Sequence, residues 1–267
     1  MGTVTRAAPQ LRRQGIELSH LRDLIVHLAK REVTSLHRFT LLGWMWPLAR
    51  QLAQLTVLVL VFSKVLDLDI ENYAVFVFSG LISWSWFASG VGNGTSSLIR
   101  QRHLVFQPRL PTIVLPVVAV AVPLVDVLLA LPVLVAMLVW TREVHWTILA
   151  LPALLAVQLV MMCGLVWFTS AANVYLRDVG NVVSVGLLML FYLTPVFYDS
   201  GRVPADYAWL LQLNPLTTLI EGYRAVLLEG TLPAPVGLAV VTAISCVLAA
   251  LGAIFFRRAS PGFVDEL

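Results

Sequence analysis

The chain has 267 residues, of which 59% are hydrophobic and 12% are charged, and its mean hydropathy is +0.86. Soluble domains carry roughly 25% charged residues, so this composition excludes a soluble globular fold. The apolar content also excludes intrinsic disorder, and two cysteines are too few for a disulfide scaffold. A net charge of +3 is too small to indicate nucleic-acid binding. What remains is a polytopic membrane protein.

The N-terminal region is polar and basic. It has no apolar run of the roughly 7 to 15 residues that a signal-peptide core needs, so we expect it to stay uncleaved. Residues 1–17 are predicted to form a flexible cytoplasmic tail. Apolar residues at helical spacing predict an amphipathic helix over residues 18–39. Because the sequence offers no soluble domain for this helix to join, we expect it to lie in the membrane interface.

Apolar segments near the roughly 20 residues that cross a hydrocarbon core fill most of the remaining chain. Only helices satisfy their own backbone hydrogen bonds in lipid, so the sequence predicts an all-α integral membrane protein with a six-helix transmembrane domain over residues 40–256. The third span contains three prolines and is expected to be kinked or to begin as a separate helix. The predicted spans are residues 48–66, 73–91, 113–140, 146–172, 182–198 and 236–256.

The distribution of positive charge predicts the orientation of these spans. With both termini inside, cytoplasmic segments hold 14 of the 18 Lys and Arg residues, including the cytoplasmic tail over residues 257–267. The four exceptions are Lys64, Arg142, Arg202 and Arg224, and many acidic residues accompany them. We therefore expect a multi-pass membrane protein with both termini in the cytoplasm.

The long loop before the last span has its own pattern. Asn214 and Pro215 are a typical helix start, since Asn caps free N–H groups and Pro suits the first helical position. An apolar stripe then continues to Gly230, a plausible helix stop. A shorter helix is expected over Pro204–Leu213. We predict two short re-entrant helices on the outer side within residues 204–228.

Catalytic and metal-binding motifs are missing. The chain has two lysines, Lys30 and Lys64, and neither lies in a GxxxxGK[ST] phosphate loop, so we expect no ATP-binding site of its own. The histidines lack metal-ligand spacing, and we expect neither metal nor cofactor in this chain. Asp126 is an ionisable residue within a predicted span. It is either a functional group or a hydrogen-bonded carboxyl that joins two helices.

A set of short motifs gives a more specific indication. They are LLGWMWP at residues 41–47, SGLISW at 79–84, NVYLRD at 173–178, TPVFY at 194–198, LNPLT at 213–217 and IEGYR at 220–224. In this order, after a basic amphipathic helix, the chain resembles type-2 ABC exporter permeases, and more narrowly those that export O-antigen, teichoic acid and capsule polysaccharides. The resemblance runs from about residue 31 to residue 230. One departure is Tyr175 and Leu176, where many relatives carry more basic residues.

The resemblance implies a homodimer in the bacterial cytoplasmic (inner) membrane that passes a lipid-linked glycan. It also implies a pairing with two copies of a cytoplasmic ABC ATPase subunit, which binds ATP and Mg. The expected contacts with the ATPase are Arg31, Ser97, Arg100, Arg102, His103, Leu104 and Val105. The expected substrate path comprises Arg38, Gly43, Trp44, Trp84, Trp86, Phe87, Tyr192 and Tyr198. The expected outer gate comprises Asn214, Pro215, Glu221 and Arg224, with Glu221 and Arg224 three residues apart on one helical face.

Two other functions stay open at this point. A secondary carrier would need no ATPase, but it typically shows repeated halves and broken helices at the membrane midplane, which the sequence lacks. A non-transporting membrane assembly protein would need no polar path. The identity of the polysaccharide does not follow from the sequence.

Overall fold

A computed structural model describes residues 23–34, 43–65, 70, 72–107, 110–142 and 144–267. Within these ranges the chain is helical and contains no strand, as predicted. Residues 23–34 form a helix, which confirms the middle of the predicted amphipathic segment, while Arg38 and the two ends of that segment lie outside the described residues. The further helices are α2 (Trp46–Val59), α3 (Tyr73–Thr95), α4 (Ser97–Arg100), α5 (Arg102–Val105), α6 (Val114–Ala121), α7 (Leu124–Thr141), α8 (Leu151–Tyr175), α9 (Asp178–Leu193), α10 (Ala208–Leu213), α11 (Pro215–Arg224), α12 (Pro235–Ala259) and α13 (Phe263–Glu266).

Five helical segments of the described chain are long and apolar enough to cross a membrane. They are Trp46–Ser63, Tyr73–Thr95, Val114–Thr141, Trp146–Tyr175 and Pro235–Glu266, and they correspond to five of the six predicted spans. The other predicted span, residues 182–198, overlaps α9, an apolar helix of 16 residues that begins four residues earlier and ends five residues earlier. Helix α9 has no buried residue, although it runs beside α3 and α8.

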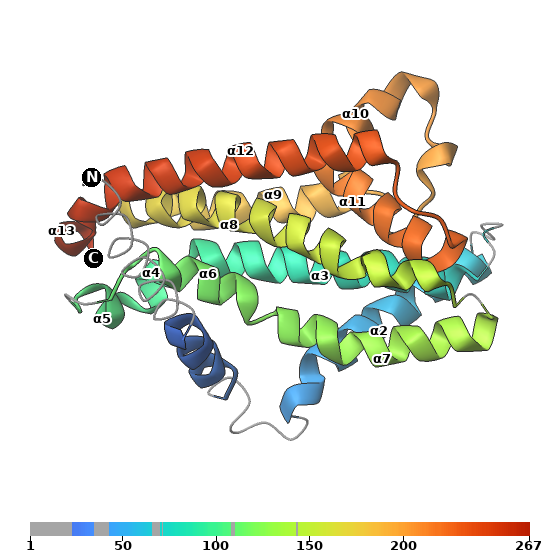
Figure 1. Cartoon of the computed structure of the whole chain (residues 1–267), viewed down its shortest axis with the longest axis horizontal. Coiled ribbons are helices and arrows are strands. Elements are labelled where there is room, and N and C mark those ends of the chain that lie inside the picture. The colour runs from blue at the N-terminus through green and yellow to red at the C-terminus, as the bar shows by residue number, and fades with distance from the viewer. Residues whose placement is uncertain (1–22, 35–42, 66–69, 71, 108–109, 143) are drawn as a thin grey trace, which may run out of the picture.

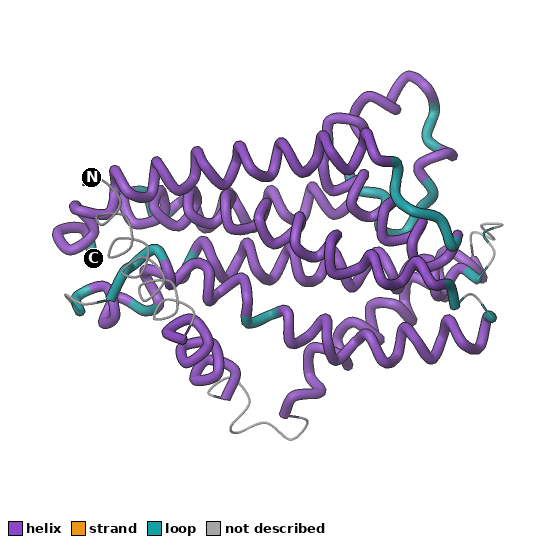
Figure 2. The backbone as a smooth tube through the Cα atoms, viewed as in Figure 1, coloured by secondary structure: helices purple, strands orange, loops and turns teal. Residues whose placement is uncertain are grey.

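The third span is broken, as its prolines predict. Helices α6 and α7 are separated at Val122 and Pro123, where the chain turns, and Figure 2 shows this break as a loop segment within the bundle. Pro123 has no N–H to continue the helix of α6. The indole Nε1 of Trp86 donates a hydrogen bond of 3.0 Å to the carbonyl oxygen of Val120, which the break would otherwise leave without a donor.

The bundle has two chemically different ends (Figure 1). The basic end comprises residues 23–34, α4, α5, α13 and the turn between α8 and α9, and its arginines include Arg102 and Arg177. The acidic end comprises α10, α11 and the loops around them, with Asp199, Asp206 and Glu229. This separation agrees with the charge pattern of the sequence.

Helices α8 and α12 form the closest pair in the bundle. A Cβ atom on Gly164 would lie 2.5 Å from backbone atoms of Leu248 and Ala249, and one on Gly252 would meet the backbone of Gly164. The two backbones therefore touch where only glycine fits, which is how small residues bring membrane helices together.

Candidate functional site: an amphiphilic cavity between two polar helix faces

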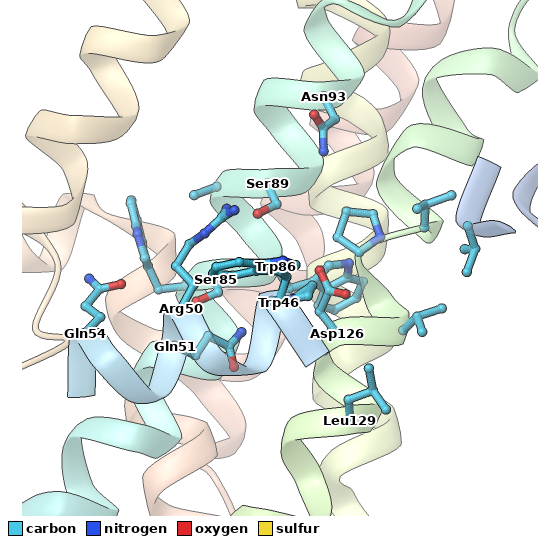
Figure 3. Close-up of a pocket in the computed structure, with 17 residues that line it drawn as sticks. Trp46, Arg50, Gln51, Gln54, Ser85, Trp86, Ser89, Asn93, Asp126 and Leu129 are labelled. Atoms are coloured by element: carbon cyan, nitrogen blue, oxygen red, sulfur yellow. The ribbon is translucent and has the colours of Figure 1, made fainter. Parts of the chain in front are cut away.

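A cavity of about 720 Å³ lies between α2, α3 and the junction of α6 and α7. Its wall is partly aromatic and partly polar, and Val33 brings the N-terminal helix to its edge. Figure 3 shows Arg50 on one side of the Trp46 and Trp86 rings and Asp126 on the other. The residues that line the cavity are Val33, Trp46, Pro47, Arg50, Gln51, Gln54, Trp84, Ser85, Trp86, Ala88, Ser89, Asn93, Val122, Pro123, Val125, Asp126 and Leu129.

Two polar stripes make the hydrophilic part of this wall. Trp46, Arg50 and Gln54 follow one another at intervals of four residues on α2, so they share one helical face. Ser85, Ser89 and Asn93 do the same on α3 and face α2 across the cavity (Figure 3).

Gln51 lies beside the first stripe and is only 5% exposed, and its Oε1 has no hydrogen-bond partner. An amide oxygen without a partner is costly inside a protein. Gln51 is also one of the residues that line the cavity, so it adds an amide group to this wall.

The predicted substrate-path residues lie in two groups. Trp84 and Trp86 line the cavity, whereas Phe87 is buried and packs against Trp84 instead. Tyr192 and Tyr198 lie beyond the cavity, at the acidic end of α9. Gly43 has a left-handed φ of 48° and lies three residues before α2, and it is not among the residues that line the cavity.

A series of aromatic contacts links the two groups. The Trp84 ring lies 5.5 Å from Phe191, which lies 5.4 Å from Phe197, which in turn lies 5.2 Å from Tyr198. The aromatic series therefore runs from the cavity to the turn that follows α9. Arg38 and the side chain of Trp44 lie outside the described residues.

Several cavity residues were not among the predicted site residues. Arg50, Gln51 and Gln54 lie within an apolar span whose average hydropathy hides them. Their spacing, repeated by Ser85, Ser89 and Asn93 on the next helix, is the signal that would have found them. Asp126, left open between two readings, lines the cavity in the first turn of α7.

The predicted ATPase-contact residues divide by burial. Arg31, Arg100, Arg102 and His103 are exposed at the basic end. Ser97, Leu104 and Val105, also expected at the contact, are buried. Leu104 and Val105 belong to an apolar cluster with Leu98, Phe256 and Phe263, which also includes residues of α6 and α8.

Hydrogen bonds join the basic end to its neighbours. Gln101 Nε2 donates to Glu32 Oε2 at 3.0 Å, which attaches the N-terminal helix to the α4–α5 segment. Arg100 donates to the backbone oxygen of Asn93 at 3.3 Å and to its side-chain oxygen at 3.4 Å. Since Asn93 lines the cavity, one side chain connects the basic surface with the cavity wall.

At the acidic end the predicted helix start is confirmed. The Asn214 side chain accepts a hydrogen bond of 3.0 Å from the Leu216 N–H and donates one of 2.8 Å to Thr194. Pro215 is the first residue of α11, and the helical segment ends at Gly230, which has a φ of 65°. Asn214 thus caps α11 and fixes it to the turn after α9.

Arg224 on α11 is 5% exposed. Its described hydrogen bond and ring contact are made with residues outside α11, and not with Glu221. Its Nη2 donates to the Val196 carbonyl oxygen at 2.8 Å, and its guanidinium lies 3.5 Å from the centre of the Phe76 ring. Burial lowers the pKa of Arg224 to about 10, and the carboxylates of Asp199 and Glu221 counteract this shift. The guanidinium therefore stays positively charged at neutral pH.

The comparisons with known proteins agree with this architecture. Residues 23–228 match the family model described as ABC-2 type transporter. The chain is 30% identical over 254 residues to an O-antigen export system permease protein of Myxococcus xanthus, covering 94% of this chain and 98% of that protein. It is 29% identical to an O-antigen export system permease protein of Klebsiella pneumoniae, covering 80% of this chain and 84% of that protein. It is 21% identical to a polysialic acid transport protein of Escherichia coli, covering 81% and 85%.

Proposed function

Because the chain belongs to the ABC-2 type transporter family, we propose that it is the permease subunit of an exporter that moves a lipid-linked polysaccharide across the cytoplasmic membrane. The observation that carries the proposal is the match to an O-antigen export permease over 94% of this chain and 98% of that protein. The polysialic acid transport protein is a second relative named for a glycan.

The cavity supports a substrate with a charged, sugar-bearing head. Arg50 supplies a cation for phosphate, and the tryptophans offer apolar ring faces on which sugars pack. The amide and hydroxyl groups of Gln51, Gln54, Ser85 and Ser89 match sugar hydroxyls. The aromatic series from Trp84 to Tyr198 gives such a substrate a path toward the acidic end.

A separate ATPase supplies the energy in this proposal, and it binds the ATP and Mg. The chain has no phosphate loop, since neither of its lysines lies in one. The exposed residues Arg102 and His103, with the N-terminal helix beside them, form the ATPase contact. Through Arg100 and Asn93 this contact is coupled to the cavity wall. Two copies of the chain complete the permease as a homodimer.

We also propose that the basic end faces the cytoplasm, as the excess of positive charge favours. Single cysteines in a background without Cys163 and Cys246 test this orientation. A membrane-impermeant maleimide added outside intact cells is expected to label position 206 and to leave positions 102 and 258 unlabelled. Labelling at position 102 from outside contradicts the orientation.

Co-purification and transport together test the function. The permease, expressed with a partner ATPase, is expected to purify as a complex that hydrolyses ATP, while the permease alone shows no hydrolysis. Depletion of the permease is expected to accumulate lipid-linked glycan in the inner leaflet. A carrier would transport without the ATPase, and an assembly protein would leave the glycan distribution unchanged; either result contradicts the proposal.

A further inference from the structure

A second cavity, of about 380 Å³, lies at the acidic end, away from the substrate cavity described above. It is enclosed by the start of α3, α11 with the π-helical turn Ala225–Glu229, and the segment that leads into α12. In Figure 1 these elements lie at the end of the bundle opposite α13. Its charged lining consists of Asp199, Glu221, Arg224 and Glu229.

Arg224 has unused hydrogen-bonding capacity in this cavity. A guanidinium carries five N–H donors, and the described structure gives Arg224 one hydrogen bond, to Val196. Its Nε is buried and has no partner. Although this Nε is enclosed by protein, Arg224 lines the cavity, so the charge of its guanidinium acts on a ligand there. The cavity thus offers a fixed cation to a ligand that carries oxygen acceptors.

The other charges restrict what that ligand can be. Three carboxylates and one guanidinium give the lining a negative balance, which disfavours phosphate and other anions. Among the described residues, no group of three His, Cys, Asp or Glu side chains converges closely enough to hold a metal ion. A neutral polyol fits both requirements, because its hydroxyls donate to carboxylates and accept from a guanidinium.

We propose that this cavity is a binding site for a neutral sugar residue, in which Glu221 and Glu229 accept from sugar hydroxyls and Arg224 donates to a sugar oxygen. The proposal rests on the polysaccharide-export function for its biological ligand, which would be a residue of the emerging glycan. It adds a second sugar-binding site, separated from the Arg50 cavity by the length of the aromatic series.

Saturation-transfer NMR on the full-length permease in lipid nanodiscs tests the site directly. The probes are glucose, galactose, mannose, rhamnose and N-acetylglucosamine at millimolar concentration, with calcium chloride as a separate arm. The variants are Glu221→Gln and Glu229→Gln, which keep side-chain size, and both positions are exposed enough to tolerate the change. Asp206→Asn is the matched control, because Asp206 is an exposed acid at the same end that does not line the cavity.

At least one sugar is expected to bind the unaltered protein and to bind about threefold or more weakly to each Gln variant, the effect of one lost hydrogen bond. The Asp206→Asn control is expected to bind it normally. Three outcomes overturn the proposal: no sugar binds, the Gln variants bind as well as the control, or calcium alone competes for the site. If the permease exports glycan with its ATPase but gives one of these outcomes, the proposed function stands and the sugar-site proposal is wrong. If the permease binds sugar but neither pairs with an ATPase nor exports glycan, the proposed function is wrong instead.

Discussion

The arginine side chains at the two ends of the bundle lie in opposite environments. At the basic end Arg102 stays in solvent, while its neighbours Leu104 and Val105 anchor the segment in an apolar cluster. At the acidic end Arg224 is buried and itself anchors its helix, through the Val196 carbonyl and the Phe76 ring. The difference indicates that the exposed charge at the basic end is available to a protein partner, whereas the buried guanidinium of Arg224 also holds its own helix in place.

The most damaging change is expected inside the apolar cluster of the basic end. Leu104→Asp places a carboxylate at a position that is 3% exposed, and should lower the free energy of unfolding by at least about 3 kcal/mol. Thermal unfolding of the purified permease, followed by loss of monodisperse elution, measures it. The exposed neighbour changed in the same way, His103→Asp, is the control. Equal stability of the two variants would show that α5 is not anchored there.

Removal of the buried cation tests the acidic end. Arg224→Met keeps much of the side-chain volume but leaves the Val196 carbonyl without its donor, and should cost about 1 to 3 kcal/mol of unfolding free energy. The same substitution at the exposed Arg142 is expected to be neutral. If Arg224→Met unfolds at the same temperature as Arg142→Met, the guanidinium has no anchoring role.

The exposed face of α5 should act on the partner rather than on the fold. Arg102→Glu combined with Phe106→Ala removes a cation and an exposed ring at the basic end, and we expect ATPase affinity to fall by about tenfold, or 1.4 kcal/mol. The unfolding temperature of the permease should not change. Binding of the purified ATPase to permease nanodiscs measures the effect, with Arg258→Glu as control. Unaltered affinity would remove α5 from the contact.

The smallest change in unfolding free energy is expected at Glu221, in contrast to Arg224. Glu221 is exposed, so Glu221→Gln should change the unfolding free energy by less than about 0.5 kcal/mol, the range for exposed charges. A larger loss of stability in a thermal scan would mean that the carboxylate helps to hold Arg224, as the i,i+3 spacing alone predicts. If stability does not change, the contacts of Arg224 with Val196 and Phe76 are what hold it in place.

Local signals in the sequence are enough to predict part of this structure. The cap at Asn214, the first turn at Pro215 and the stop at Gly230 follow from the conformational preferences of single residues, and the broken third span follows from Pro123. Each of these features depends on neighbours within a few positions. The helix order and the family resemblance were also readable from the sequence.

Other features depend on contacts between distant segments. Leu104 is buried in a cluster that contains Phe256 and Phe263, more than 150 residues later. The partners of Arg224 belong to α3 and to the turn after α9, so no spacing rule within α11 identifies them. The polar stripe at Arg50 was overlooked for a different reason, because average hydropathy ignores which face of a helix carries the polar residues.

The contact between Gly164 and Gly252 has a consequence for mechanics. Main-chain atoms of α8 and α12 meet there without intervening side chains, so no change of rotamer can lengthen or shorten the contact. The two helices are therefore expected to move together as one rigid body when the protein changes conformation. Displacement must then occur in the parts that are not held in this way, such as α7 beyond its break and α9, which buries none of its residues.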